Sequence, residues 1–121
     1  MHHYALLSLF VLFIGKHFIV DYVLQYPYMI EQKGTYGAIG GLHHSALHGF
    51  GTFIIMLFFV GPFNSMLASL IDAVTHYHID YFKQNITKHY TTNDRMFWIA
   101  LGLDQALHYI TYAFILGVFV V

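Results

Sequence analysis

The chain has 121 residues, of which 58% are hydrophobic and only 9% are charged, and its formal net charge is -1. This length allows one domain, residues 1–121, and so apolar a composition is typical of an integral membrane protein rather than a soluble one. The lack of a basic surplus excludes the usual nucleic-acid binder, and the lack of cysteine excludes disulfides and thiolate-bound metals.

Four apolar segments meet the length of about 20 residues that a membrane-spanning helix needs. They cover residues 4–24, 43–61, 62–84 and 96–121. The first has no small-residue cleavage site and is too long for a signal sequence, so we expect it to be retained. Residues 25–42 are rich in glycine and tyrosine, which predicts an interfacial turn, whereas Gly61-Pro62 predicts a tight turn before the third helix. The predicted fold is all-α, an integral membrane four-helix bundle.

The few basic residues predict the orientation. Lys33, Lys88 and Arg95 lie in the first and third loops, and Lys83 lies at the adjoining helix end. The opposite face, with both termini and the short second loop, has no Lys or Arg. By the positive-inside rule, the termini should lie outside the cytoplasm.

Each predicted helix contains His or Asp residues spaced four positions apart, and side chains at this spacing lie on one helix face. When the antiparallel helices are aligned by depth, all of these residues fall in the cytoplasmic half. The nine candidate metal ligands are His17, Asp21, His44, His48, Asp72, His76, Asp80, Asp104 and His108.

The free-energy cost of burying such a cluster must be offset by partners or by a bound ion, because one ionisable residue inside a membrane costs about 2.5 to 3.5 kcal/mol. Imidazole and carboxylate suit divalent zinc, iron or manganese, and nine ligands are too many for one tetrahedral ion. We therefore predict two divalent ions in the bundle core, as in soluble di-metal carboxylate bundles. The simpler interpretation, a hydrogen-bonded network that joins helices, normally needs only one or two polar residues.

A weak internal repeat suggests the same symmetry. Residues 17–25 match residues 76–84 at His, Asp, Tyr and Gln, and residues 46–48 match residues 106–108. The halves 1–61 and 62–121 would then be parallel helical hairpins related by an axis along the membrane normal. Asp72 has no counterpart, which suggests that it bridges or tunes one ion.

These motifs resemble an uncharacterised family of small bacterial and phage membrane proteins, domain of unknown function 3307, over nearly the whole chain. The resemblance implies a bacterial inner-membrane location but no particular activity. After Leu24-Gln25 a small polar pair is expected, and this chain has Tyr26-Pro27 instead. The residues that carry the resemblance are His17, Asp21, Leu24, Gln25, His44, His48, Asp72, His76, Asp80, Lys83, Asp104, Gln105 and His108.

The remaining polar residues receive other roles. We expect His43 and His78 to face the interface or packed surroundings, and Lys16 to extend to the headgroups. His2, His3 and His89 should be solvated. The candidates for hydrogen-bond partners that orient the ligands are Gln25, Gln84, Gln105 and Lys83, with Tyr22 and Tyr81 less specific.

The favoured function is a metal-dependent hydrolase that acts on a phosphoester or lipid headgroup at the cytoplasmic membrane face, with Asp72 or Asp104 as the catalytic base. Di-iron oxidation of acyl chains is a variant. A metal or proton transporter is the alternative, although a through-path is disfavoured because the outer half of every helix is almost purely apolar. A metal-stapled structural subunit, with homo-oligomers allowed, is the third hypothesis.

Overall fold

The structure, a computed structural model, describes residues 3–121. These residues form five α-helices and one π-helical turn, and there is no strand among them, so the all-α prediction is confirmed. The elements are α1 (His3–Phe18), the π-helix η1 (Ile19–Val23), α2 (Pro27–Gln32), α3 (Ile39–Leu57), α4 (Pro62–Thr87) and α5 (Arg95–Phe119).

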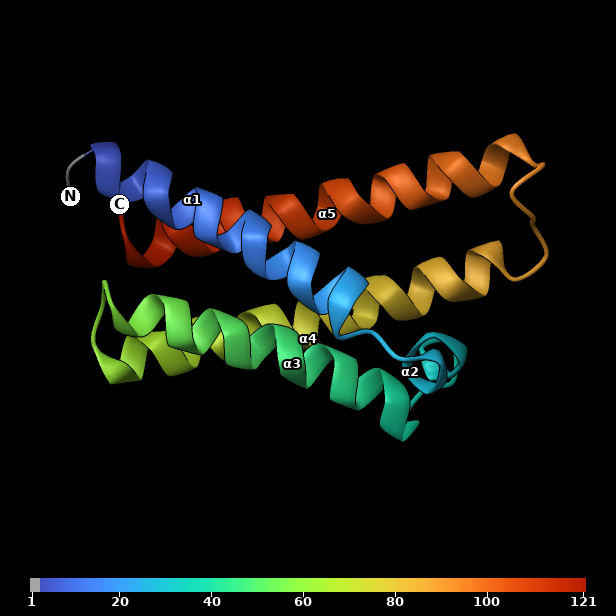
Figure 1. Cartoon of the computed structure of the whole chain (residues 1–121), viewed down its shortest axis with the longest axis horizontal. Coiled ribbons are helices and arrows are strands. Elements are labelled where there is room, and N and C mark those ends of the chain that lie inside the picture. Colours follow the sequence, from blue (N-terminus) through green and yellow to red (C-terminus); the bar gives the residue numbers. More distant parts are fainter. Residues whose placement is uncertain (1–2) are drawn as a thin grey trace.

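The four long helices run antiparallel to their neighbours in the chain (Figure 1). The first described residues, the C-terminus and the 58–61 turn lie together at one end of the molecule, which we call the terminal end. Helix α2 and the 88–94 loop lie at the opposite end, the α2 end (Figure 1). Pro62 stands at the first turn of α4, as the sequence predicted, where its missing N–H breaks no helical hydrogen bond.

The segment between the first two long helices is more ordered than an interfacial turn. It contains α2, and α3 begins at Ile39 rather than at His43. Gly40 explains both differences, because a Cβ built on it would lie 2.5 Å from the backbone oxygen of Tyr28. The glycine that suggested an irregular loop instead allows α2 to pack against the first turn of α3, where the Gln32 side chain accepts a hydrogen bond from the Gly40 N–H at 2.7 Å.

The main cluster of buried hydrophobic residues lies toward the terminal end of the bundle. Its buried members come from all four long helices: Leu9, Phe13, Met56, Ala68, Tyr112, Ile115 and Leu116. Two helical stretches, His3–Val23 and Arg95–Phe119, are long and apolar enough to cross a membrane by length and composition. Helices α3 and α4 instead contain most of the candidate ligands.

Candidate metal centre

The predicted polar stripes face the interior. Eight of the nine candidate ligands are buried, and Asp21 is half-buried. Helix α4 shows the reason, since its buried positions Ser65, Ala68, Asp72, His76 and Asp80 recur every three or four residues. The stripe that is apolar or small near the terminal end thus becomes ionisable toward the α2 end without leaving the same helix face.

One group of four candidate ligands surrounds the carboxylate of Asp21. Its Oδ1 lies 2.8 Å from Nε2 of His48 and 3.1 Å from Nε2 of His44. Nε2 of His76 lies 4.0 Å from the same oxygen and 3.3 Å from Nε2 of His44. Three helical segments, η1, α3 and α4, together supply one carboxylate and three imidazoles that could hold a metal ion.

A second group adjoins the first and shares His76 with it. Asp80 lies 3.2 Å from Nε2 of His76 through Oδ2 and 3.2 Å from Nε2 of His108 through Oδ1. His48, His76 and His108 form a column of stacked rings, with centroid separations of 3.6 Å and 4.0 Å. Nε2 of His76 faces both groups, so through that atom the residue would ligate one ion at a time.

The spacing of these atoms fits a metal. Bonds of about 2.0 to 2.1 Å in a tetrahedral site place neighbouring ligand atoms about 3.3 Å apart. The distances within the two groups bracket that value, and all ligand atoms of a group lie within 4.8 Å of one another.

The charge of the site also favours a cation. Three carboxylates, Asp21, Asp80 and Asp104, face one buried ammonium, Lys33, so with neutral histidines two negative charges remain in excess. Oδ1 of Asp104 is buried without a hydrogen-bond partner among the described residues, while the buried Oδ2 of Asp80 lies 3.0 Å from the ammonium of Lys33 and 3.2 Å from Nε2 of His76. The negative charge of a buried carboxylate needs a hydrogen-bond donor or a cation beside it, and a divalent ion would provide the remaining positive charge.

His17 lies beside the first group without joining it. Its Nε2 is 3.0 Å from Oδ2 of Asp21 and 2.8 Å from Oε1 of Gln105, while its Nδ1 is 2.7 Å from the hydroxyl of Tyr112. These contacts position the ring, which meets Asp21 at Oδ2, whereas the three imidazoles of the first group meet it at Oδ1. The sequence did not single out Tyr112, although it lies four residues after His108 on the same helix face.

Asp104 lies beside the second group. Its Oδ1 is 3.4 Å from Nε2 of His108, and its Oδ2 accepts a hydrogen bond of 2.9 Å from the Gln105 side chain. Gln105 therefore contacts both His17 and Asp104. Asp104 keeps one buried oxygen free to accept a further ligand or a proton.

Asp72 belongs to neither group, contrary to its prediction as a ligand. It accepts a hydrogen bond of 2.7 Å from the ammonium of Lys16 and another from the hydroxyl of Thr52. The prediction that Lys16 extends to the headgroups is wrong for the same reason, because this side chain is only 5% exposed. An ammonium only donates hydrogen bonds, so Nδ1 of His48, 3.2 Å from Lys16, accepts, and the ring proton lies on Nε2 toward Asp21. A metal bound at Nε2 would displace that proton.

Two further features were not predicted. Lys33, at the C-terminal end of α2, is buried and lies 3.0 Å from Oδ2 of Asp80, so the segment before α3 covers the site with a positive charge. Asp21 lies in the π-helix η1, where the Leu24 N–H bonds to the Ile19 carbonyl five residues earlier at 2.9 Å. Such π-turns often occur at functional sites and shift the direction of a side chain.

The other predicted partners do not contact ligand side chains. Gln25 donates to the backbone oxygen of Asp21, Gln84 donates to that of Ile30, and Lys83 donates to Gln84. The remaining histidines lie outside both groups: His3, His43 and His89 are exposed, His78 is half-buried and bonds to Tyr36, and His2 lies outside the described residues.

Comparison with known proteins identifies a family. The profile described as "Protein of unknown function (DUF3307)" matches residues 9–121. No curated protein and no solved structure matches the chain. The match covers α3, α4, α5, most of α1 and every candidate ligand, but it assigns none of them a role.

Proposed function

This chain belongs to the DUF3307 family, and from its site we propose that it is a membrane-embedded, dinuclear His/Asp metalloprotein that acts as a hydrolase at the cytoplasmic membrane face. The observation that carries the proposal is the convergence of the two ligand groups, Asp21 with three imidazoles and Asp80 with two, around a shared His76.

The distribution of side chains supports a membrane location for all four long helices. Large hydrophobic residues are exposed along α3 and α4 as well as along α1 and α5, while 14 of the buried residues are polar or charged. A soluble domain rarely buries Lys, Asp and His in such numbers or leaves so much apolar surface in water. Hydrocarbon around the bundle accounts for both halves of this pattern.

Corresponding contacts in the two halves support the repeat and the pair of ions. The His17–Asp21 and His76–Asp80 pairs, four residues apart, are separated by 3.0 Å and 3.2 Å. Asp21 then contacts His48 at 2.8 Å, as Asp80 contacts the matching His108 at 3.2 Å. Two parallel hairpins would each supply one carboxylate as the centre of a metal site.

Hydrolysis is the chemistry that this ligand set suits best. A bound divalent ion polarises a phosphoryl or carbonyl oxygen and lowers the pKa of bound water to about 7. Asp104 is the better of the two predicted bases, because it has a free buried oxygen, whereas Asp72 is held by Lys16. Asp104 would take the proton that the attacking water loses as the phosphorus–oxygen ester bond breaks.

Metal content is the first test. We expect about two zinc, iron or manganese ions per purified chain, and about one in each of the Asp21→Asn and Asp80→Asn variants. The chain offers two matched controls. His43→Ala is the control for His44→Ala, because the two residues are adjacent. His78→Ala is the control for His76→Ala, because it lies two residues away. The control variants should keep both ions, whereas the His44 variant should lose the ion of the first group and the His76 variant, which alters both groups, should lose at least one. Less than one ion in the wild type, or equal content in variant and control, would refute the proposal.

Turnover separates the enzyme from the other hypotheses. Metal-loaded protein is incubated with lipid and nucleotide phosphoesters, and Asp104→Asn should abolish hydrolysis while it keeps its metal. Unfolding on chelation without hydrolysis of any phosphoester would instead identify a structural staple. Metal or proton flux into vesicles would identify a transporter. Hydrogen bonds to backbone carbonyls already occupy the hydroxyls of Ser8, Ser65 and Ser69 in the half of the bundle toward the terminal end.

A further inference from the structure

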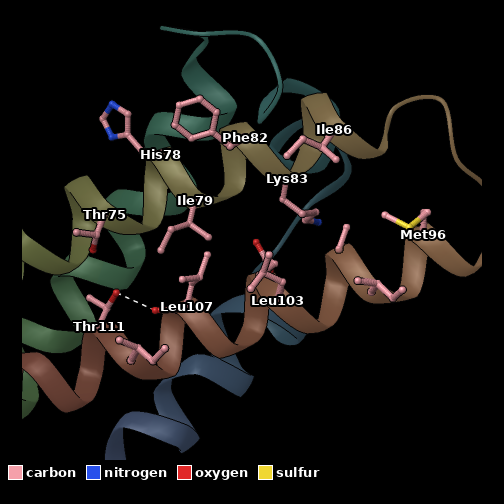
Figure 2. Close-up of a pocket in the computed structure, with 14 residues that line it drawn as sticks. Thr75, His78, Ile79, Phe82, Lys83, Ile86, Met96, Leu103, Leu107 and Thr111 are labelled. Carbon is pink, nitrogen blue, oxygen red and sulfur yellow. Dashed lines mark hydrogen bonds between the residues drawn. The ribbon is translucent and has the colours of Figure 1, made fainter.

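An apolar groove of about 520 Å³ runs between α4 and α5. Figure 2 shows Ile79 of α4 facing Leu103 and Leu107 of α5 across it, with Lys83 and Met96 toward the 88–94 loop. The groove is as large as typical small-molecule sites, which measure about 300 to 1,000 Å³. It lies against the second ligand group, because Asp104 is one of its lining residues.

The shape and lining of the groove suit a hydrocarbon chain. The lining extends from Thr75 to Ile86 along α4, which corresponds to about 16 Å of helix. Aliphatic side chains form most of it, and Phe82 is the only phenyl, indole or phenol ring among the lining residues. A long, largely apolar groove with mostly non-aromatic lining fits a flexible chain better than a flat ring.

The polar groups of the groove indicate which way a bound hydrocarbon chain would lie. Thr75 and Thr111, at the deep end, donate to the carbonyls of Ile71 and Leu107 at 2.6 Å and 3.0 Å. They therefore have little capacity to recognise a ligand. Lys83, one turn from the end of α4, has no carboxylate within 4.0 Å among the described residues. The end of the groove at Thr75 and Thr111 is thus suited to the methyl end of a hydrocarbon chain, and the end at Lys83 is suited to an anion.

We propose that the α4–α5 groove binds one acyl chain of an anionic phospholipid, with the lipid phosphate at Lys83. This inference rests on the proposed function and narrows it, because it names a lipid phosphoester as the substrate. The lysine lies at the α2 end, which the positive-inside rule places at the cytoplasmic headgroups. The headgroup esters then enter the part of the groove that Asp104 lines, beside His108.

Binding of single-chain lipids to the purified full chain in mild detergent tests the proposal. The probes are palmitoyl lysophosphatidic acid, palmitoyl lysophosphatidylcholine and chain-free glycerol 3-phosphate, titrated by native mass spectrometry. Ala100→Phe fills the groove, and its control is Ala106→Phe on the exposed face of the same helix. Lys83→Gln removes the anion partner, and its control is Lys88→Gln, an exposed lysine at the same end.

We expect lysophosphatidic acid to bind about tenfold more tightly than lysophosphatidylcholine, as one charge-assisted contact would give. Lys83→Gln should abolish this preference, and Ala100→Phe should weaken both lipids at least about tenfold. Equal binding by Ala100→Phe and Ala106→Phe would show only bulk lipid around the helices and overturn the proposal. Competition by glycerol 3-phosphate would show a phosphate site without a chain. Loss of a dimer in Ala100→Phe, with lipid binding unchanged, would show that a second copy occupies the groove.

The readouts keep this inference separate from the metal proposal. Metal content of the Ala100→Phe and Lys83→Gln variants should equal that of the wild type, since neither residue belongs to a ligand group. If the lipids fail to bind while the metals remain, only the proposal that the groove binds lipid is overturned. A wild-type chain that binds the lipid but contains no metal as purified would overturn the hydrolase proposal and leave the groove as a lipid site.

Discussion

The buried ion pair between Lys16 and Asp72 is the interaction whose loss should destabilise the protein most. The two side chains are 5% and 1% exposed, and Nζ lies 2.7 Å from Oδ2. In Lys16→Met the apolar stem is kept while the ammonium is removed. The carboxylate of Asp72 would then remain in the bundle with only the hydroxyl of Thr52 as a partner.

The expected cost follows from the burial of both partners. Removing one member of a buried pair typically costs about 3 to 5 kcal/mol, because the remaining charge is uncompensated. Replacing both members with apolar residues of similar volume is often neutral or stabilising. Lys16→Met should therefore lower the free energy of unfolding by about 3 to 5 kcal/mol, and Lys16→Met/Asp72→Leu should recover most of that loss.

Reversible unfolding in mild detergent, followed by circular dichroism, measures all four corners of this double-mutant cycle. Lys88→Met is the control, because Lys88 is exposed and its loss should change stability by less than about 0.5 kcal/mol. Additive effects of the two substitutions, with no coupling energy, would refute the reasoning. A Lys16→Met protein as stable as the Lys88→Met protein would refute it as well.

Two further variants test the supports of the site. Gly40→Ala places a Cβ against the Tyr28 carbonyl and should detach α2, at a cost of about 1 to 3 kcal/mol, with faster hydrogen exchange over residues 27–33. Gly15→Ala, with nothing within 4 Å of its Cβ, should leave that exchange unchanged, and equal exchange in both would contradict the prediction. Tyr112→Phe leaves Nδ1 of His17 without its hydroxyl partner and should lower the free energy of unfolding by about 1 to 3 kcal/mol. Tyr109→Phe is the control, and an equal loss in both variants would count against a role for the hydroxyl.

Several residues of the site are predictable from helical periodicity alone, and the burial of Lys16 is one that the same periodicity indicates. Lys16 shares a helix face with Leu9, Phe13 and Val20, all of them buried. This spacing of four, three and four residues marks an inward position, so the burial of Lys16 was readable from the same periodicity that identified His17 and Asp21. The stem of a lysine is also long enough to carry its ammonium from a membrane helix to the headgroups. The choice between these positions depended on whether a carboxylate lay opposite, which a single helix does not reveal.

Lys33 had no such signal. It lies in a segment whose glycines and tyrosines are typical of a loop, and its ion pair with Asp80 joins positions 47 residues apart in the chain. The short helix α2 depends on the close approach that Gly40 allows, and that approach exists only once α3 is in place. Contacts of this kind are decided by packing between elements, so local residue preferences do not predict them.

By itself, the sequence determined the helical class, the tight turn at Gly61-Pro62 and the inward stripes of His and Asp, because helical periodicity and turn chemistry are local properties of the chain. Only the tertiary structure decided how those stripes divide. Helix rotation and depth set which imidazole meets which carboxylate, and so they placed His76 between two groups, paired Asp72 with Lys16 and left Asp104 with a free oxygen. The same packing opened the groove between α4 and α5, which depends on side chains from two helices at once.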